Sequence, residues 1–509
     1  MRKAEAYWPL ILLLAIIKFV LPLFLQSPGY ELQRDEYLYY QQGQHLALGY
    51  LENPPLISYL GTISSWFGDH EAWIKIWPCF FGAATLVITC LITAELGGKL
   101  FAQFLAGISI MTGAYMRVHF LFQPNMLDIF FWTLAVYFII RYINEKEETL
   151  FFCFTISLAL GFWGKYSVLF IIAGILLALL LSHHRKIFTV KKFYVAALLG
   201  LLIILPNVWW QYQHNWPLLH HMEELQETQL KYMNPVEFIT DQFMMLLATV
   251  LVWVAGLVWY LKNKQWRFLA YTYFLVILFL ILGRGKSYYS LGIYPMLLAA
   301  GAVMWEQWTQ KRNWARYVFT ILIIAFTYMI LPMLLPIWKP DKLAAFYEKI
   351  GIEHKWEDQK NHPLPQDFAD MLGWRELTEK TEKVYNTGLP VAIRDSTIIY
   401  CRNYGQAGSL KFYGLSSDFK DRVISDNGSF LLWIPDSLRF RHLLFIGSRM
   451  PDKDDEVFRH FESYIVMDSV TNPLSRQFGN KIILFENADQ QANKLATEGL
   501  NEMKKKFNR

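Results

Sequence analysis

The stretch WPLILLLAIIKFVLPLFL, from Trp8 to Leu25, is long and apolar enough to cross a lipid bilayer as one helix. Further apolar segments of near-spanning length follow it up to residue 337. The pair that flanks Gly164 and Lys165 could also be one broken helix. The sequence therefore predicts a mainly α, polytopic membrane bundle over residues 1–337. Its eleven predicted spans are 8–25, 78–96, 101–116, 124–142, 151–164, 166–182, 193–210, 238–260, 267–282, 287–305 and 315–337.

Composition supports this division of the chain. Of 509 residues, 54% are hydrophobic and only 18% are charged, whereas about a quarter of a soluble domain is charged. Residues 338–509 read as ordinary soluble sequence, in which strand-like and helix-like runs alternate, and this pattern predicts a C-terminal soluble α/β domain. The strand-like runs are 390–393, 430–434, 442–446 and 481–485, and the helix-like runs are 404–413, 455–464 and 488–507.

Several functional classes find no support. The net charge of +5 is small and no basic run alternates with aromatics, so nucleic acid is not an expected partner. The chain has no phosphate-binding loop, dinucleotide fingerprint or nucleophile elbow. The run Asp452-Lys453-Asp454 has the spacing with which nucleotide-sugar enzymes hold a metal, but it lies among other charges and we interpret it as a solvated loop.

The loops between the spans indicate an orientation. Basic residues gather at Arg2-Lys3 and in the loops near 183–192, 262–267 and 311–316, which the positive-inside rule assigns to the cytoplasm. The remaining loops, including a long first loop at 27–77, then face outward together with the soluble domain. We predict a multi-pass protein of the cytoplasmic membrane whose C-terminal domain is extracytoplasmic.

Two acidic groups stand out on this outward side. Asp35 and Glu36 follow the first span in the sequence Arg34-Asp35-Glu36-Tyr37, where a carboxylate can deprotonate an acceptor hydroxyl or hold a divalent cation. Taken alone, such a pair would more often be solvated loop charge. Asp128 begins an apolar helix, and a carboxylate at membrane depth is a functional candidate by default.

Cations on the same side run against the positive-inside bias and therefore indicate an anionic ligand. A lipid-linked phosphate would suit them, because ammonium and guanidinium groups bind phosphate well. They are Lys165, Arg284, Lys286 and, less centrally, Arg117. The outward loop from Trp209 to Trp216, which contains His214, is rich in aromatic and amide groups that bind sugars, although an ordinary aromatic membrane belt has the same composition.

In this order, the motifs resemble those of bacterial GT-C glycosyltransferases that use polyprenyl-phosphate sugars. These family 39-like proteins are related to protein O-mannosyltransferases and to lipid A aminoarabinose transferases. The resemblance covers most of the membrane part. The residues that carry it are 34–37, Gly49-Tyr50, Asn53-Pro54-Pro55-Leu56, 124–132, 164–167, 206–214, 285–289, Tyr294-Pro295 and, in the tail, Tyr404-Gly405-Gln406-Ala407-Gly408.

The resemblance implies an inverting glycosyltransferase. It makes Asp35 the general base with Glu36 beside it, and it makes Asp128 a second acid near the active site. A polyprenyl-phosphate sugar would be the donor, and a lipid, glycan or protein hydroxyl the acceptor. Tyr288 and His214 fall in motifs expected to bind the donor. Where relatives often carry His or Lys, this chain has Asn53, which can still hydrogen-bond phosphate.

No cofactor is certain, although a divalent metal ion could share the stabilisation of the phosphate, with Glu36 and Glu52 as candidate ligands. Two alternatives remain open at this point. One is a transporter or flippase of lipid-linked sugars, which would need charges near the bilayer midplane. The other is an inactive membrane protein that binds carbohydrate. The sugar, the acceptor and the polyprenyl length are not encoded in any motif that we recognise.

Overall fold

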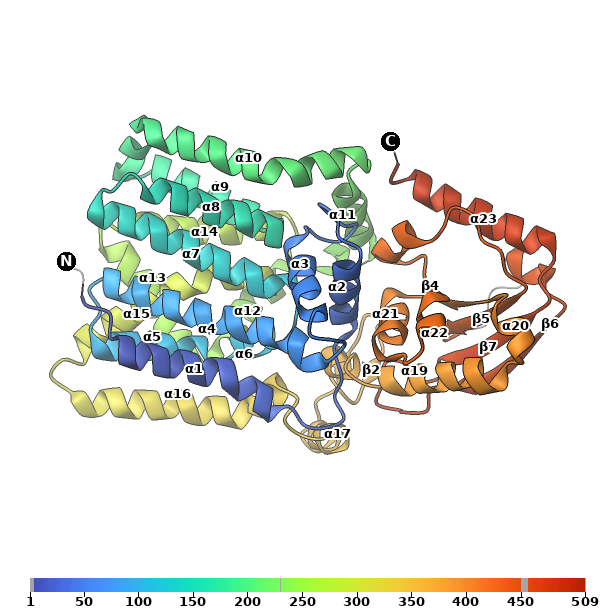
Figure 1. The fold of residues 1–509 in the computed structure, drawn as a ribbon. Coiled ribbons are helices and arrows are strands. Elements are labelled where there is room, and N and C mark those ends of the chain that lie inside the picture. Colours follow the sequence, from blue (N-terminus) through green and yellow to red (C-terminus); the bar gives the residue numbers. More distant parts are fainter. Residues whose placement is uncertain (1–3, 229, 450–455, 509) are drawn as a thin grey trace.

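The computed structural model describes residues 4–228, 230–449 and 456–508, so Arg2-Lys3 and Asp452-Lys453-Asp454 lie outside the described residues. A bundle of long helices forms one side of the molecule, and a smaller domain built on a β-sheet forms the other (Figure 1). Helix α1 begins at the end of the bundle that points away from the sheet domain. The chain passes from the bundle to the sheet domain between the end of α16 at Leu334 and the start of α17 at Pro340.

Each predicted span contains at least one helix of the bundle. Five of the described helices, α1, α4, α7, α10 and α16, are long and apolar enough to cross a membrane. Two bent pairs, α9 with η1 and α12 with the η3–α13 segment, raise the number to seven if each pair is one span. The main bundle helices are α1 (Trp8–Leu25), α4 (Glu71–Glu95), α5 (Leu100–Ile110), α7 (Pro124–Glu145), α8 (Leu150–Gly164), α9 (Val168–Leu180), η1 (His183–Thr189), α10 (Lys191–Gln213), α12 (Pro235–Met245), η3 (Leu247–Thr249), α13 (Val250–Lys262), α14 (Arg267–Leu282), α15 (Tyr294–Trp308) and α16 (Asn313–Leu334).

The first long loop folds into two short helices at the junction of the two parts. These helices are α2 (Arg34–Gln44) and α3 (Leu56–Ser65). The side chains of Gln33 and Glu36 form a capping box at the start of α2. This cap favours a helix here although the residues of α2 are mostly polar.

Two glycines allow α13 and α15 to touch along their backbones. A Cβ atom on Gly301 would lie 1.8 Å from the carbonyl oxygen of Val252, and one on Gly256 would lie 1.9 Å from that of Leu297. These oxygens belong to the backbone, so a new Cβ could fit only if one of the two helices moved away. Small residues at such positions are how membrane helices pack closely.

We therefore expect Gly301→Ala to push these helices apart and to cost about 1–3 kcal/mol or more in stability. Thermal unfolding of the purified chain in detergent measures the effect. The matched control is Gly499→Ala on the tail helix α23, where a new Cβ meets nothing within 4 Å. An equal melting temperature for the two variants would contradict the close approach of α13 and α15.

The sheet domain is built on five strands in the order β4-β3-β5-β7-β6. Strand β3 runs parallel to β4 and β5, whereas β7 runs antiparallel to β5 and β6, so the sheet is mixed. A separate hairpin of β1 and β2 precedes it. The strands are β1 (His354–Lys355), β2 (Asn361–His362), β3 (Thr397–Cys401), β4 (Val423–Ile424), β5 (His442–Gly447), β6 (Ser463–Ser469) and β7 (Lys481–Glu486).

The tail thus confirms a C-terminal domain that mixes helices and strands. The runs at 404–413, 442–446, 481–485 and 488–507 have the predicted type. Two others are wrong, because 390–393 is mostly the short helix α20 and 430–434 is mostly 3₁₀ helix. The described part of 455–464 is helical only over the 3₁₀ helix at Glu456–His460, and strand β6 begins at Ser463. The remaining helices of the chain are α6 (Ala114–Val118), α11 (Pro217–Thr228), η2 (Leu230–Tyr232), η4 (Ser287–Ile293), α17 (Pro340–Lys349), α18 (Gln366–Ala369), α19 (Trp374–Lys383), η5 (Val384–Gly388), α20 (Val391–Arg394), α21 (Tyr404–Tyr413), α22 (Ser417–Asp421), η6 (Gly428–Trp433), η7 (Glu456–His460) and α23 (Gln490–Lys505).

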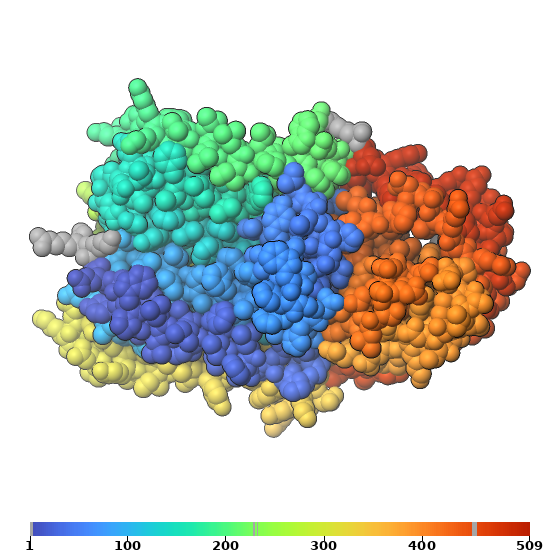
Figure 2. Space-filling model, in the orientation of Figure 1, coloured from blue at the N-terminus to red at the C-terminus, as the bar shows by residue number. Residues whose placement is uncertain are grey.

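Helix α2 joins the two parts of the molecule. Leu38 of α2 is buried in the core of the sheet domain together with Leu410 and Leu444. A Cβ on Gly408 of α21 would lie 2.7 Å from the Cβ of Tyr37, so α2 and α21 pack with almost no space between them. Figure 2 shows the first loop and the sheet domain meeting along a continuous seam on the visible face. The sheet domain is therefore fixed over one end of the bundle.

Candidate functional site

Asp35 lies in the first turn of α2, at the junction of the bundle and the sheet domain. Its Oδ1 atom accepts hydrogen bonds from the Tyr404 hydroxyl at 2.7 Å and from Arg34 Nε at 3.3 Å. Its Oδ2 atom accepts only a long hydrogen bond, 3.3 Å, from Gln123 Nε2 among the partners that the structure describes. The side chain is partly exposed, at 24%. The carboxylate is thus held mainly through Oδ1, on a side chain that is partly exposed.

Glu36 next to it has a different environment. Its Oε1 atom accepts from Lys75 Nζ at 2.8 Å and from the Phe122 amide at 2.7 Å. Its Oε2 atom accepts from Lys75 Nζ at 2.7 Å and from the Gln33 amide at 2.7 Å. These four contacts use the four lone-pair positions of the carboxylate. Fully buried, Glu36 therefore joins α2 to α4 and is not placed to act as a base or as a metal ligand.

Removal of Lys75 should consequently destabilise the fold. Lys75→Met leaves a buried charge on Glu36 without its cation, which costs about 3–5 kcal/mol in comparable pairs. The double variant Glu36→Gln with Lys75→Met removes that charge and should recover part of the loss. Thermal melting of the three proteins in one detergent compares them. If Lys75→Met has the same melting temperature as wild type, the ion pair contributes nothing to stability.

Lys165 and Asp128 form a second charged group just inside the bundle. Lys165 follows α8, and its Nζ donates to Asn125 Oδ1 at 2.6 Å and lies 3.9 Å from the ring centre of Tyr289. Asp128 is buried near the start of α7, just after its first turn, and interacts electrostatically with Lys165. Its Oδ1 atom has no hydrogen-bond partner within the described part of the chain. The buried carboxylate thus accompanies a lysine whose ammonium group faces aromatic rings.

Lys286 connects this group with Asp35. It interacts with the charges of Glu357, Asp35 and Arg34, and also acts on Lys165. Burial lowers the pKa of Lys286, and the carboxylates of Glu357 and Asp35 oppose that shift. The ring of Tyr288 lies 5.5 Å from the Lys165 ammonium group. The structure thus brings Asp35, Asp128, Lys165, Lys286 and Tyr288 to one region.

Four other predicted donor ligands make no hydrogen bond or ion pair with these groups among the described residues, and each has an environment of its own. The Nε atom of Arg117 pairs with Asp367 of the tail at 3.2 Å, and its guanidinium stacks 4.6 Å from the Phe368 ring centre. The Asn53 amide is buried, and it bonds to Gln42 and to the Pro54 carbonyl. His214 stacks on Trp210 at the end of α10, at 4.1 Å. Arg284 is exposed on the turn after α14.

The predicted metal ligands do not converge. Glu52 accepts from the Ser429 amide at 2.7 Å and from Gln42 at 3.0 Å, so it ties the first loop to the sheet domain. Burial raises its pKa. Within residues 4–228, 230–449 and 456–508, no group of three or more His, Cys, Asp or Glu side chains is placed to hold a metal ion.

Three side chains that contact the site were not predicted as site residues. They are Gln123 and Arg34, which bond to Asp35, and Tyr404, which reaches Asp35 from 369 positions away. Arg34 and Tyr404 belong to motifs that carry the family resemblance, and this was the signal by which the sequence could have identified them as site residues. No spacing rule could connect Tyr404 with Asp35, because the contact depends on how the sheet domain docks.

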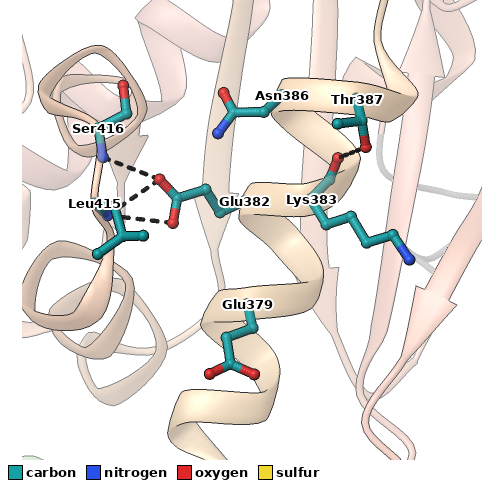
Figure 3. A pocket seen from close by; sticks show the side chains of 7 residues that line it. All are labelled: Glu379, Glu382, Lys383, Asn386, Thr387, Leu415 and Ser416. Atoms are coloured by element: carbon teal, nitrogen blue, oxygen red, sulfur yellow. Dashed lines mark hydrogen bonds between the residues drawn. The ribbon is translucent and has the colours of Figure 1, made fainter.

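A pocket of the sheet domain lies apart from these groups. It is formed by the end of α19, by η5 and by the loop at Leu415 and Ser416 (Figure 3). The Glu382 carboxylate points into the loop and accepts from the amides of Leu415 and Ser416 at 3.0–3.2 Å. None of the predicted site residues lines it.

Residues 52–210 match the family model described as dolichyl-phosphate-mannose-protein mannosyltransferase. The chain is 26% identical over 215 residues to the lipid A galacturonosyltransferase RgtD of Rhizobium johnstonii, an alignment that covers 41% of this chain and 45% of that protein. The chain thus aligns with less than half the length of this curated relative.

Two solved structures share the fold over nearly the whole chain. ArnT from Cupriavidus metallidurans bound to undecaprenyl phosphate superposes with a TM-score of 0.61 at 10% identity, covering 95% of this chain and 98% of that one. Its apo state gives 0.60 at 10% identity, covering 94% and 98%. At such identity the likeness concerns the fold alone. The predicted resemblance to GT-C glycosyltransferases is confirmed by the family match. Through residues 52–210 the chain is thus similar to the family of dolichyl-phosphate-mannose-protein mannosyltransferases.

Proposed function

We propose that this multi-pass membrane protein is an inverting glycosyltransferase that moves a sugar from a polyprenyl phosphate to an acceptor hydroxyl. The observation that carries the proposal is the position of Asp35. Its partly exposed carboxylate lies at the junction of the two domains, and its charge interacts with that of Lys286, which in turn acts on Lys165. A base with fixed cations near it is what transfer from a lipid phosphate requires.

The relatives support the choice of substrates. The matching family model is named for transfer from dolichyl-phosphate mannose, and one related fold was solved with undecaprenyl phosphate. The relative RgtD acts on lipid A. We therefore favour lipid A as the acceptor among the lipid, glycan and protein hydroxyls that the sequence leaves open.

In the proposed reaction, Oδ2 of Asp35 takes the proton of the acceptor hydroxyl. The acceptor oxygen attacks the anomeric carbon from the face opposite the lipid phosphate, and a new C–O bond forms as the bond to the phosphate oxygen breaks. The electron pair of the broken bond leaves on the phosphate, and the configuration of the anomeric carbon inverts. A positioned base of this kind accelerates such transfers about 10²–10⁴-fold.

The leaving phosphate gains negative charge in the transition state, so cations fixed beside it lower the barrier more than they strengthen ground-state binding. Lys165 and Lys286 have this role in the proposal. The buried carboxylate of Asp128 keeps the ammonium group of Lys165 charged and oriented, as opposite charges do at close range. Tyr288 adds an aromatic wall on the same side.

The proposed placement in the membrane follows from the loops. We propose that the shorter apolar helices α5, α8, α14 and α15 also cross, giving eleven spans in the cytoplasmic membrane of a bacterium. The sheet domain and Asp35 then face the extracytoplasmic side, where a lipid donor and an envelope acceptor can meet. Cysteine accessibility on intact spheroplasts would test this orientation.

The direct test uses membranes that contain the chain and undecaprenyl phosphates carrying labelled galacturonate, aminoarabinose or mannose, with lipid A as acceptor. The proposal expects label in lipid A from one donor and an inverted anomeric configuration of the product by NMR. If every labelled donor stays intact but is moved between leaflets of proteoliposomes, the chain is a flippase and the proposal is wrong.

A further inference from the structure

The shortest hydrogen bond to Asp35 comes from the sheet domain and not from the membrane bundle. Tyr404 Oη donates to Asp35 Oδ1 at 2.7 Å, whereas the contacts from Arg34 and Gln123 measure 3.3 Å. The guanidinium of Arg34 also lies 5.4 Å from the Tyr404 ring centre. Arg34, Asp35 and Tyr404 thus form a closed triangle in which Tyr404 contacts both neighbours.

The backbone around Tyr404 is fixed from several directions. Tyr404 begins helix α21, whose preceding residue Asn403 caps it by accepting from the Gln406 amide at 3.0 Å. The amide of Tyr404 donates to Asn427 Oδ1 at 3.2 Å. A tyrosine held in this way loses little further entropy when its hydroxyl meets a carboxylate.

Two glycines bring α21 directly onto α2. A Cβ on Gly405 would lie 2.6 Å from Cγ of Arg34, and a Cβ on Gly408 would lie 2.7 Å from Cβ of Tyr37. Only residues without a side chain permit this approach. The distance between the Tyr404 hydroxyl and Asp35 is therefore set by helix packing.

We propose that Tyr404 is a positioning residue for the catalytic base, so that the sheet domain completes the active site. The Tyr404 hydroxyl donates to Oδ1 of Asp35 and so fixes the carboxylate with Oδ2 directed to the acceptor. Only Oδ2 takes the proton of the acceptor hydroxyl. This inference rests on the proposed function. Burial, followed by the charge of Asp35, raises the pKa of Tyr404 well above its usual value, so the hydroxyl keeps its proton and remains a donor.

The test compares Tyr404→Phe with wild type in the full-length chain, using the donor that supports transfer in the panel above. Loss of a hydrogen bond to a charged group predicts a fall in kcat of about 10–100-fold, with KM for donor and acceptor changed less than about twofold. Tyr385→Phe is the matched control, because Tyr385 donates to Asp418 at 2.6 Å in the same domain but away from Asp35. Its kcat should equal that of wild type.

A second comparison separates positioning from a structural role. In Asp35→Glu the carboxylate is displaced by one methylene, so adding Tyr404→Phe should change the remaining rate by less than about twofold, as expected when two residues act as one unit. Tyr404→His, which keeps a ring donor, should recover part of the rate. It also serves as the test if Tyr404→Phe does not fold.

Four outcomes overturn the inference. Tyr404→Phe could behave like Tyr385→Phe, or it could lose the same factor of kcat on the Asp35→Glu background as on wild type. Tyr404→His could be as slow as Asp35→Glu. If wild type consumes none of the three donors, the proposed function itself is wrong and the inference falls with it. If wild type is active and Tyr404→Phe is equally active, only the inference is wrong.

Discussion

Replacing Asp35 with asparagine is expected to lower sugar transfer about 10²–10⁴-fold, the usual contribution of a positioned general base. Asparagine has nearly the same shape, and its amide oxygen can still accept from the Tyr404 hydroxyl that bonds to Asp35 at 2.7 Å. The variant therefore removes the proton acceptor while it keeps the packing of α2. Initial rates with the productive undecaprenyl-phosphate donor measure the effect.

The control for this experiment is Asp418→Asn, which changes an exposed carboxylate of the sheet domain that pairs with Arg422. Its rate should match that of wild type. If Asp35→Asn transfers sugar as fast as this control, Asp35 is not the base. Glu36 could not readily replace it, since Lys75 and two backbone amides occupy its lone pairs. The search would then turn to Asp128.

Replacing Lys165 with methionine is expected to have the second-largest effect, a fall in kcat of about 10²–10³-fold, as when one group that stabilises developing charge is lost. Methionine fills a similar volume against the Tyr289 ring, which now lies 3.9 Å from the ammonium group. Because the phosphate gains charge only as it leaves, kcat should fall more than the affinity for the donor.

Lys192→Met is the matched control, because Lys192 lies in a predicted cytoplasmic loop and pairs with Glu148 at 3.2 Å. It should leave both kcat and KM unchanged. A further variant, Asp128→Asn, should weaken transfer in the same sense as Lys165→Met but by less, because it leaves the cation in place. Equal rates for Lys165→Met and Lys192→Met would exclude Lys165 from the site.

Much of the fold could be predicted from short-range patterns. Apolar segments such as Trp8–Leu25 specify helices because lipid leaves no other way to satisfy backbone polar groups. Alternation of short apolar runs with helical ones likewise indicated the mixed sheet domain. The errors lie where runs are very short. The segment at 390–393 was predicted as a strand, but a proline at its start favours a first helical turn, and the true strand Thr397–Cys401 follows it.

The site could be predicted only in part. Asp35, Asp128, Lys165 and Lys286 were recognisable, because charges at the ends of apolar segments are costly and therefore conspicuous. Arg117 looked equivalent to them, yet it pairs with Asp367, whose position depends on how the tail docks. Neighbours in sequence also differ in exposure, since the Asp35 side chain is partly exposed whereas Glu36 is fully buried.

The sequence by itself determined that the chain is a helical membrane protein with a C-terminal domain of mixed helices and strands, and it identified several acidic and basic groups of the candidate site. These properties depend on composition and local periodicity, which are already present in the unfolded sequence. Only the tertiary structure decided which of those charges meet. The contact between Tyr404 and Asp35 joins groups 369 positions apart, and it exists because Gly405 and Gly408 let α21 pack directly on α2.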